Sequence, residues 1–102
     1  MTEIKRILPY PTIFVRAVAL DIVESISEDA TVDKEHWKLS GTMKIYGIDS
    51  FFSMEIDARD DEHTVMEIKM LKPNSKLSTE GKNRAISFLA DSIEQLLENT
   101  FV

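Results

Sequence analysis

Apolar and polar residues alternate with a period of two through the middle of the chain. Between His36 and Gly47 the apolar residues fall on alternate positions, namely Trp37, Leu39, Met43 and Ile45. The alternation resumes after a turn at 47–50 and again after a turn at 58–63. A period of two is typical of half-buried strands, and connections this short allow only antiparallel pairing. The pattern predicts a three-stranded antiparallel meander over 36–71.

Two other segments have the helical period. Residues 12–26 start with Thr12, a candidate N-cap, and their apolar residues recur at a spacing that lines one helical face. Residues 79–101 carry a second stripe, made of Ala85 or Ile86, Leu89, Ile93, Leu96 or Leu97, and Phe101. A strand is predicted at 2–8, because Pro9 and Pro11 cannot donate to a ladder. The polar segment 27–35 is predicted to be a loop.

These elements follow one another in the order β-α-β-β-β-α. A chain of 102 residues has length for one core, so residues 1–102 form a single domain. Both helices need an apolar partner, and the meander offers one apolar face. The predicted fold class is therefore α+β, a two-layer sandwich with a four-stranded antiparallel sheet and both helices on one face. We expect the first strand to join an edge of the meander.

The inner face of this sheet is rich in methionine and has two interpretations. Its side chains either fill the core beneath the helices or line a cavity for an apolar ligand, to which flexible methionines adapt well. The core interpretation is favoured, because a protein of this size has little apolar surface to spare. The residues that would hold a ligand in the alternative are Trp37, Met43, Phe52, Met54, Met66 and Met70.

Gly41 falls on the same inner face, and its missing side chain leaves room for a bulky group opposite. On the outer, polar face, apolar residues are predicted to gather near one end of the sheet. Exposed apolar residues mark interfaces, and a dimer with paired edge strands would cover them. These candidate interface residues are Tyr46, Phe51, Val65 and Leu71.

The amino-acid composition disfavours several classes of binding partner. The net charge is −6, and the twelve basic residues are scattered, which disfavours nucleic acid and anionic lipid surfaces. The chain has no cysteine for disulfides or thiolate ligands, and no apolar run of signal-peptide or membrane-span length. We expect a cytoplasmic protein.

Candidate chemistry is sparse. His36 and His63 have no second histidine or carboxylate at metal-ligand spacing, such as i, i+4 on a helix. The carboxylates of "DARDDE", residues 57–62, lack the ligand spacing and glycine of a calcium loop, so a hairpin turn is predicted there. Neither a nucleophile elbow nor a phosphate loop is present. We expect no enzyme activity, no metal and no cofactor.

The segments "ILPYPTIFVRAVALDIV" and "LSTEGKNRAISFLADSIEQLLENTF" give the chain an order that resembles a shortened helix-grip domain, the class of START and polyketide-cyclase-like proteins. With Trp37 and the "YGIDSFF" turn, the chain is also similar to the small polyhydroxyalkanoic acid system proteins of bacteria. Ser50 stands where that family has a second glycine. The resemblance implies an apolar ligand between sheet and long helix, in a pocket that a dimer completes.

Taken together, these observations predict a non-enzymatic bacterial protein that acts as an interaction module and forms a homodimer. The alternative is a carrier or sensor of a small apolar or acyl ligand held between sheet and helices. The sequence leaves both interpretations open.

Overall fold

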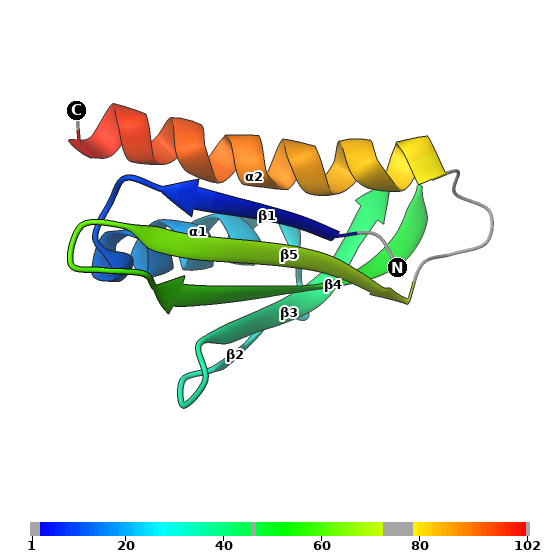
Figure 1. Cartoon of the computed structure of the whole chain (residues 1–102). Helices are drawn as coiled ribbons and strands as arrows, with labels where there is room; N and C mark the ends of the chain where they lie inside the picture. The colour runs from blue at the N-terminus through cyan, green and yellow to red at the C-terminus, as the bar shows by residue number, and fades with distance from the viewer. Residues whose placement is uncertain (1–2, 46, 73–78, 102) are drawn as a thin grey trace.

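The computed structural model describes residues 3–45, 47–72 and 79–101. Figure 1 shows one sheet with two helices packed on it. The strands and helices, in chain order, are β1 (Glu3–Leu8), α1 (Thr12–Ile26), β2 (Thr31–Asp33), β3 (Lys38–Ile45), β4 (Ile48–Ala58), β5 (Thr64–Lys72) and α2 (Thr79–Phe101). The predicted α+β class, both helices and the antiparallel meander are confirmed.

The sheet has five strands, in the order β1-β5-β4-β3-β2, so the predicted count of four is wrong. The extra strand is β2, which lies in the segment predicted to be a loop. It is only three residues long and pairs Val32 with Leu39 of β3. Three residues are too few to show a period of two, which explains why the polar composition concealed it. The first strand joins the β5 edge of the meander, as expected.

Both helices cover the same face of the sheet. α1 contacts β3 and β4, α2 contacts β5 and β1, and the helices also contact each other. The ring of Phe14 near the start of α1 lies 4.4 Å from that of Phe101 at the end of α2, so the helices run antiparallel. Figure 1 shows these two helix ends at the same end of the molecule.

Cross-strand pairing builds the core in rows. Met54 of β4 pairs with Leu39 on one side and Ile68 on the other, and Ile68 pairs with Ile4 of β1. Met54, Leu39 and Ile68 are fully buried. Complete burial of such a side chain contributes about 1.5–3 kcal/mol, so each of the three stabilises the fold by an amount of this order.

An ion-pair cluster fixes the long helix over the sheet edge. Arg6 alternates inward on β1, opposite Met66, and its guanidinium donates to Asp91 at 2.5 Å and to Glu94 at 2.8 Å. Arg6 is less exposed than either acid, so the bonds are partly shielded from water. Asp91 and Glu94 lie on the flank of α2 that faces β1.

A second polar cluster ties the end of α1 to β3. Ser27 is buried directly after α1, and its hydroxyl donates to Asp29 at 2.7 Å and accepts from the Thr42 amide at 3.1 Å. Asp29 also accepts from the Thr42 amide and hydroxyl, both at 2.8 Å. The hydrogen bond from Ser27, followed by those from Thr42, lowers the pKa of Asp29 to about 2.

Gly41 lies beneath this cluster. A side chain there would meet Ser27, whose Cβ lies 3.1 Å from the position that a Gly41 Cβ would occupy. The space predicted opposite Gly41 is therefore filled by the chain that leaves α1.

Among the described residues, neither helix has the length and hydropathy needed to cross a lipid bilayer.

Candidate functional site

The methionine-rich inner face is packed core. Phe52, Met54 and Met70 are fully buried, Met66 is 1% exposed and Met43 is 9% exposed. Their cross-strand neighbours and the inward faces of α1 and α2 belong to the same apolar cluster. The structure therefore brings together five of the six predicted ligand-binding residues, with Phe52, Met54, Met66 and Met70 in a filled interior and Met43 at its margin.

Trp37, the sixth residue, is not on a strand. It lies in the turn between β2 and β3 with a φ of 47°, in the left-handed region that bulky residues rarely adopt. Its partly buried ring lies 4.9 Å from the Arg16 guanidinium of α1. The prediction that Trp37 points inward from a strand is wrong, because β3 begins only at Lys38 and Trp37 belongs to the turn before it.

An open groove lies where the end of α1, β3 and the first half of α2 meet. We call it the helix groove; its volume is about 460 Å³. Met43 and Ala85 form its deep part, since each is 9% exposed, whereas Phe88 is 66% exposed on its wall. The complete lining described by the structure is Ile26, Met43, Lys44, Gly81, Arg84, Ala85 and Phe88.

Two cationic side chains stand at the rim of the helix groove. Lys44 and Arg84 are both exposed, and Arg84 donates to Glu80 at 2.6 Å along α2. A guanidinium has five donors, so this single bond leaves others for a ligand. A second, more polar depression of about 640 Å³ adjoins the groove and shares Ile26 and Lys44 with it.

Of the lining residues, the sequence pointed only to Met43 as a ligand contact. The signal that identifies Phe88 is that it is apolar yet lies off the stripe predicted for 79–101. Ile26 belongs to the predicted stripe of α1, but it is 36% exposed because it lies at the very end of the helix. Ala85 lies on the stripe predicted for 79–101, and Arg84 carries no comparable signal.

A third depression, of about 610 Å³, lies beside the β2–β3 turn and is predominantly acidic; its lining includes Arg16, Glu55 and Asp57. There Asp33, Glu35 and His36 place ligand atoms within 4.8 Å of one another, so His36 does have carboxylates nearby. The Asp33 carboxylate already accepts from the Glu35 amide and contacts the His36 ring at 3.0 Å. This contact with His36 lowers the pKa of Asp33. These bonds are those of a hairpin turn.

Arg16 closes the inner side of this acidic depression. Its guanidinium donates to the Ile56 carbonyl at 3.1 Å while lying against Trp37. Its buried Nε has no hydrogen-bond partner among the described residues. Arg16 thus holds the turn against the end of β4.

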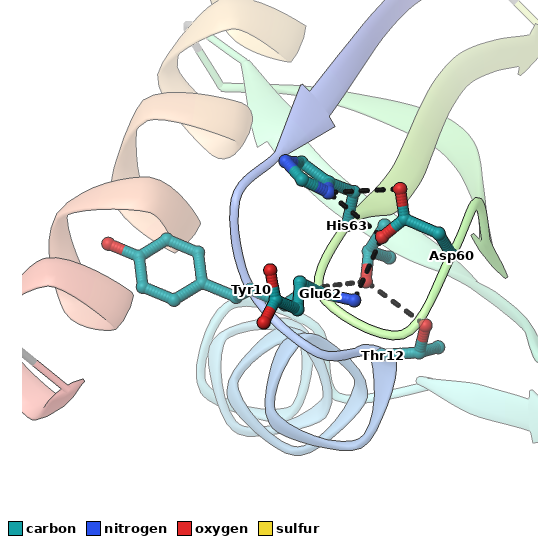
Figure 2. A network of polar contacts seen from close by, with 6 residues as sticks. Tyr10, Thr12, Asp60, Glu62 and His63 are labelled. Carbon is teal, nitrogen blue, oxygen red and sulfur yellow. Dashed lines mark hydrogen bonds and ion pairs between the residues drawn. The ribbon is translucent and has the colours of Figure 1, made fainter.

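The "DARDDE" segment forms the β4–β5 hairpin turn, as predicted. Figure 2 shows Asp60 accepting from the Glu62 amide at 2.8 Å and contacting the His63 ring at 2.8 Å. The interaction with His63 lowers the pKa of Asp60. At the base of the turn, Thr64 donates to the Tyr10 carbonyl at 2.8 Å. The turn is therefore anchored beside the start of α1.

The structure separates two of the four predicted interface residues, Phe51 and Val65. Phe51 pairs with Lys72, whereas Val65 pairs with Asp57, six residues further along β4. At about 3.3 Å per residue this separates them by about 20 Å. Phe51 is 44% exposed on the outer face, and Val65 is partly exposed. Tyr46 and the side chain of Leu71 lie outside the described residues.

Comparison with known proteins bears on the fold. No family model and no curated protein matches the chain. Among solved structures, a START superfamily protein from Mycobacterium smegmatis matches 96% of this chain and 97% of its own, with a TM-score of 0.60 and 8% identity. The similarity to polyhydroxyalkanoic acid system proteins is not confirmed. At 8% identity the match concerns the fold alone, and it shows that the chain has a START-like helix-grip fold.

Proposed function

We propose that the protein binds a small apolar molecule with an anionic head group, of the acyl type, in the helix groove. One observation carries the proposal, namely an apolar groove of about 460 Å³ with two cations at its rim. Small-molecule sites typically measure about 300–1,000 Å³ and combine a mostly apolar lining with a few placed polar groups. The helix groove has this composition.

The position of the groove agrees with the alternative predicted from the sequence. Helix-grip domains commonly hold apolar ligands between the sheet and the long helix. Here that interior is occupied by Phe52, Met54 and Met70, which are fully buried. The groove opens at the margin of the same space, with Met43 at its base. An acyl chain bound there would cover Phe88 and Ile26, which are otherwise exposed.

The rim charges favour a carboxylate over a cation. Lys44 and Arg84 flank the apolar lining, and the groove lining contains no acidic residue among the described residues. Glu80 is the ion-pair partner of Arg84, but both side chains are well exposed, so water screens their attraction. The proposed role is binding, without a catalytic step.

Decanoate and decanol test the proposal as probes, by calorimetry and by backbone amide shifts. We expect saturable binding of decanoate, with shifts at Met43, Ala85 and Phe88, and weaker binding of decanol. Phe88→Ser should weaken both probes, whereas Arg84→Glu should weaken decanoate alone. Ile7→Ser is the control, because Ile7 is 51% exposed on β1 and far from the groove. Binding weaker than about 1 mM, or equal in all variants, contradicts the proposal.

The homodimeric interaction module stays a second candidate, supported by the 44% exposure of Phe51. Its test is sedimentation: Phe51→Asp should convert a dimer to a folded monomer. A wild-type protein that sediments as a monomer at high concentration rules the dimer out.

A further inference from the structure

We infer that the end of the molecule formed by the start of α1 and the end of α2 is a docking surface for a basic amphipathic segment of another protein. The surface, here called the end patch, consists of Tyr10, Ile13, Phe14, Ala17 and Phe101. It lies at the opposite end of the helices from the helix groove, so the inference does not depend on the proposed ligand.

The end patch is apolar and continuous. The ring of Phe14 packs against that of Phe101 with centroids 4.4 Å apart, and the Tyr10 and Phe101 centroids are 6.5 Å apart. Ile13 is 72% exposed, Phe101 42% and Phe14 39%. Ala17 is also exposed, one turn beyond Ile13 on α1. Single exposed apolar residues are ordinary, but a contiguous aromatic group at one end of a small protein marks an interaction site.

Exposed acidic side chains lie on the three elements that adjoin the end patch, namely α1, α2 and the β4–β5 turn. Exposed Asp21 follows it on α1 and exposed Glu98 precedes Phe101 on α2. The β4–β5 turn, anchored to Tyr10 through Thr64, adds exposed Glu62 (Figure 2). Asp61 of the same turn is also exposed. α2 has no basic residue in its last turn, so its carbonyl end adds negative potential beside Phe101, which offsets the positive potential of the amino end of α1; the excess of negative charge comes from the acidic side chains.

Basic residues near the end patch are few and engaged elsewhere. Arg16 lies on α1, but its guanidinium is bound to Ile56 and stacked on Trp37. Arg59 is the exposed basic residue of the β4–β5 turn, and it stands among three acids. The rim therefore has a clear excess of negative charge.

The negative charge around the end patch indicates which kind of partner binds there. A second copy would bring the same acidic rim against itself in a chain of net charge −6, and an anionic lipid surface would be repelled. A protein segment with apolar anchors flanked by lysine or arginine would place its anchors on the end patch and its basic side chains against the surrounding carboxylates. An amphipathic basic helix has this arrangement.

The test uses a synthetic helical peptide with leucine at every third or fourth position and lysine elsewhere. Its analogue, with glutamate for lysine, is the matched probe. We expect the lysine peptide to shift the amides of Ile13, Phe14, Ala17 and Phe101, with affinity that falls as salt is added. The glutamate peptide should not bind. Shifts spread over all acidic surfaces instead contradict the inference.

Two surface substitutions separate the apolar and the charged contributions. Ile13→Ser should weaken the lysine peptide about tenfold or more, the effect of losing a central anchor. Glu98→Lys should weaken binding of the lysine peptide less than Ile13→Ser does, and should reduce the dependence of its affinity on salt. Ile7→Ser is the control, because it removes an equally apolar, 51% exposed side chain from the sheet. Equal effects of Ile13→Ser and Ile7→Ser overturn the inference.

Two further measurements distinguish the other occupants. Sedimentation that shows a dimer dissolved by Ile13→Ser would assign the end patch to a second copy. Binding to phosphatidylserine vesicles, lost in the same variant, would assign it to a membrane. Either result overturns the inference. Circular dichroism confirms folding, and Ala17→Lys replaces Ile13→Ser if that variant does not fold.

Discussion

Adding one methyl group at Gly41 should destabilise the fold through a single identified contact. Gly41 lies on β3 beneath Ser27, and its φ is not in the left-handed region, so the backbone accepts alanine. The new Cβ would stand 3.1 Å from the Ser27 Cβ, 3.4 Å from the Ala30 Cα and closer still to the Ser27 hydroxyl. Ser27 must therefore move.

The size of the stability loss follows from the hydrogen bonds that Ser27 makes. Its hydroxyl bonds Asp29 and the Thr42 amide, so a displacement weakens two hydrogen bonds. Overpacking in a buried site costs about 1–3 kcal/mol, and each hydrogen bond contributes about 0.5–1.5 kcal/mol. Alanine returns about 0.4–1 kcal/mol by reducing the entropy of the unfolded chain. Gly41→Ala should therefore lower the free energy of unfolding by about 1–5 kcal/mol, with the upper figure applying if both hydrogen bonds are lost.

The assay is urea denaturation of a double-mutant cycle with Ser27→Gly, which removes both clashing atoms. In that background Gly41→Ala should cost nothing or stabilise slightly. Gly47→Ala is the contrasting variant, because a Cβ there meets nothing within 4 Å but the φ of 78° strains it. Its cost should be unchanged by Ser27→Gly. The reasoning fails if Gly41→Ala loses less than about 0.5 kcal/mol, or loses the same amount in both backgrounds.

Three further outcomes follow from the packing and the charges. Met54→Ala should cost about 2–5 kcal/mol in urea denaturation because Met54 is fully buried, whereas Ile7→Ala at a 51% exposed site should cost under about 1 kcal/mol. The pKa of Asp29 is lowered in the folded state from 3.8 to about 2, so its stabilisation is complete above pH 3.8 and is lost toward pH 2. Asp29→Asn should therefore reduce the change in the free energy of unfolding between pH 3.8 and pH 2. Arg6→Met leaves Asp91 and Glu94 without their partner, and should increase amide exchange in the second half of α2 more than in α1.

Local pattern was sufficient for most of the elements. The period of two identified β3, β4 and β5 because each is at least eight residues long and buries its apolar side chains mainly on one side. It failed at Thr31–Asp33, whose pairing is imposed by Ser40, Leu39 and Lys38 rather than by its own composition. The prediction for Trp37 was also wrong. Trp37 continues the alternation of β3 in the sequence, but in the structure it belongs to the hairpin turn that precedes this strand.

The candidate site depended on contacts that a sequence does not display. Ile26 and Phe88 lie on different helices and line the same groove because α1 and α2 pack antiparallel. Alternation placed Phe51 and Val65 on one face, but it gave no position along the strands, so their separation required the register. The choice between core and pocket likewise required the burial of each methionine, because methionine is suited to both.

The unequal lengths of the two helices explain why a groove exists beside a filled core. α1 has 15 residues and α2 has 23, so at 1.5 Å per residue they extend about 22 Å and 35 Å. The Phe14–Phe101 contact aligns the start of α1 with the end of α2, which places the whole excess of about 12 Å at the beginning of α2. There α2 and β3 have no first helix between them, and Ala85 and Met43 face the opening. The same alignment gathers the aromatic rings at the other end, so one difference in length places the proposed ligand groove and the proposed docking surface at opposite ends of the helices.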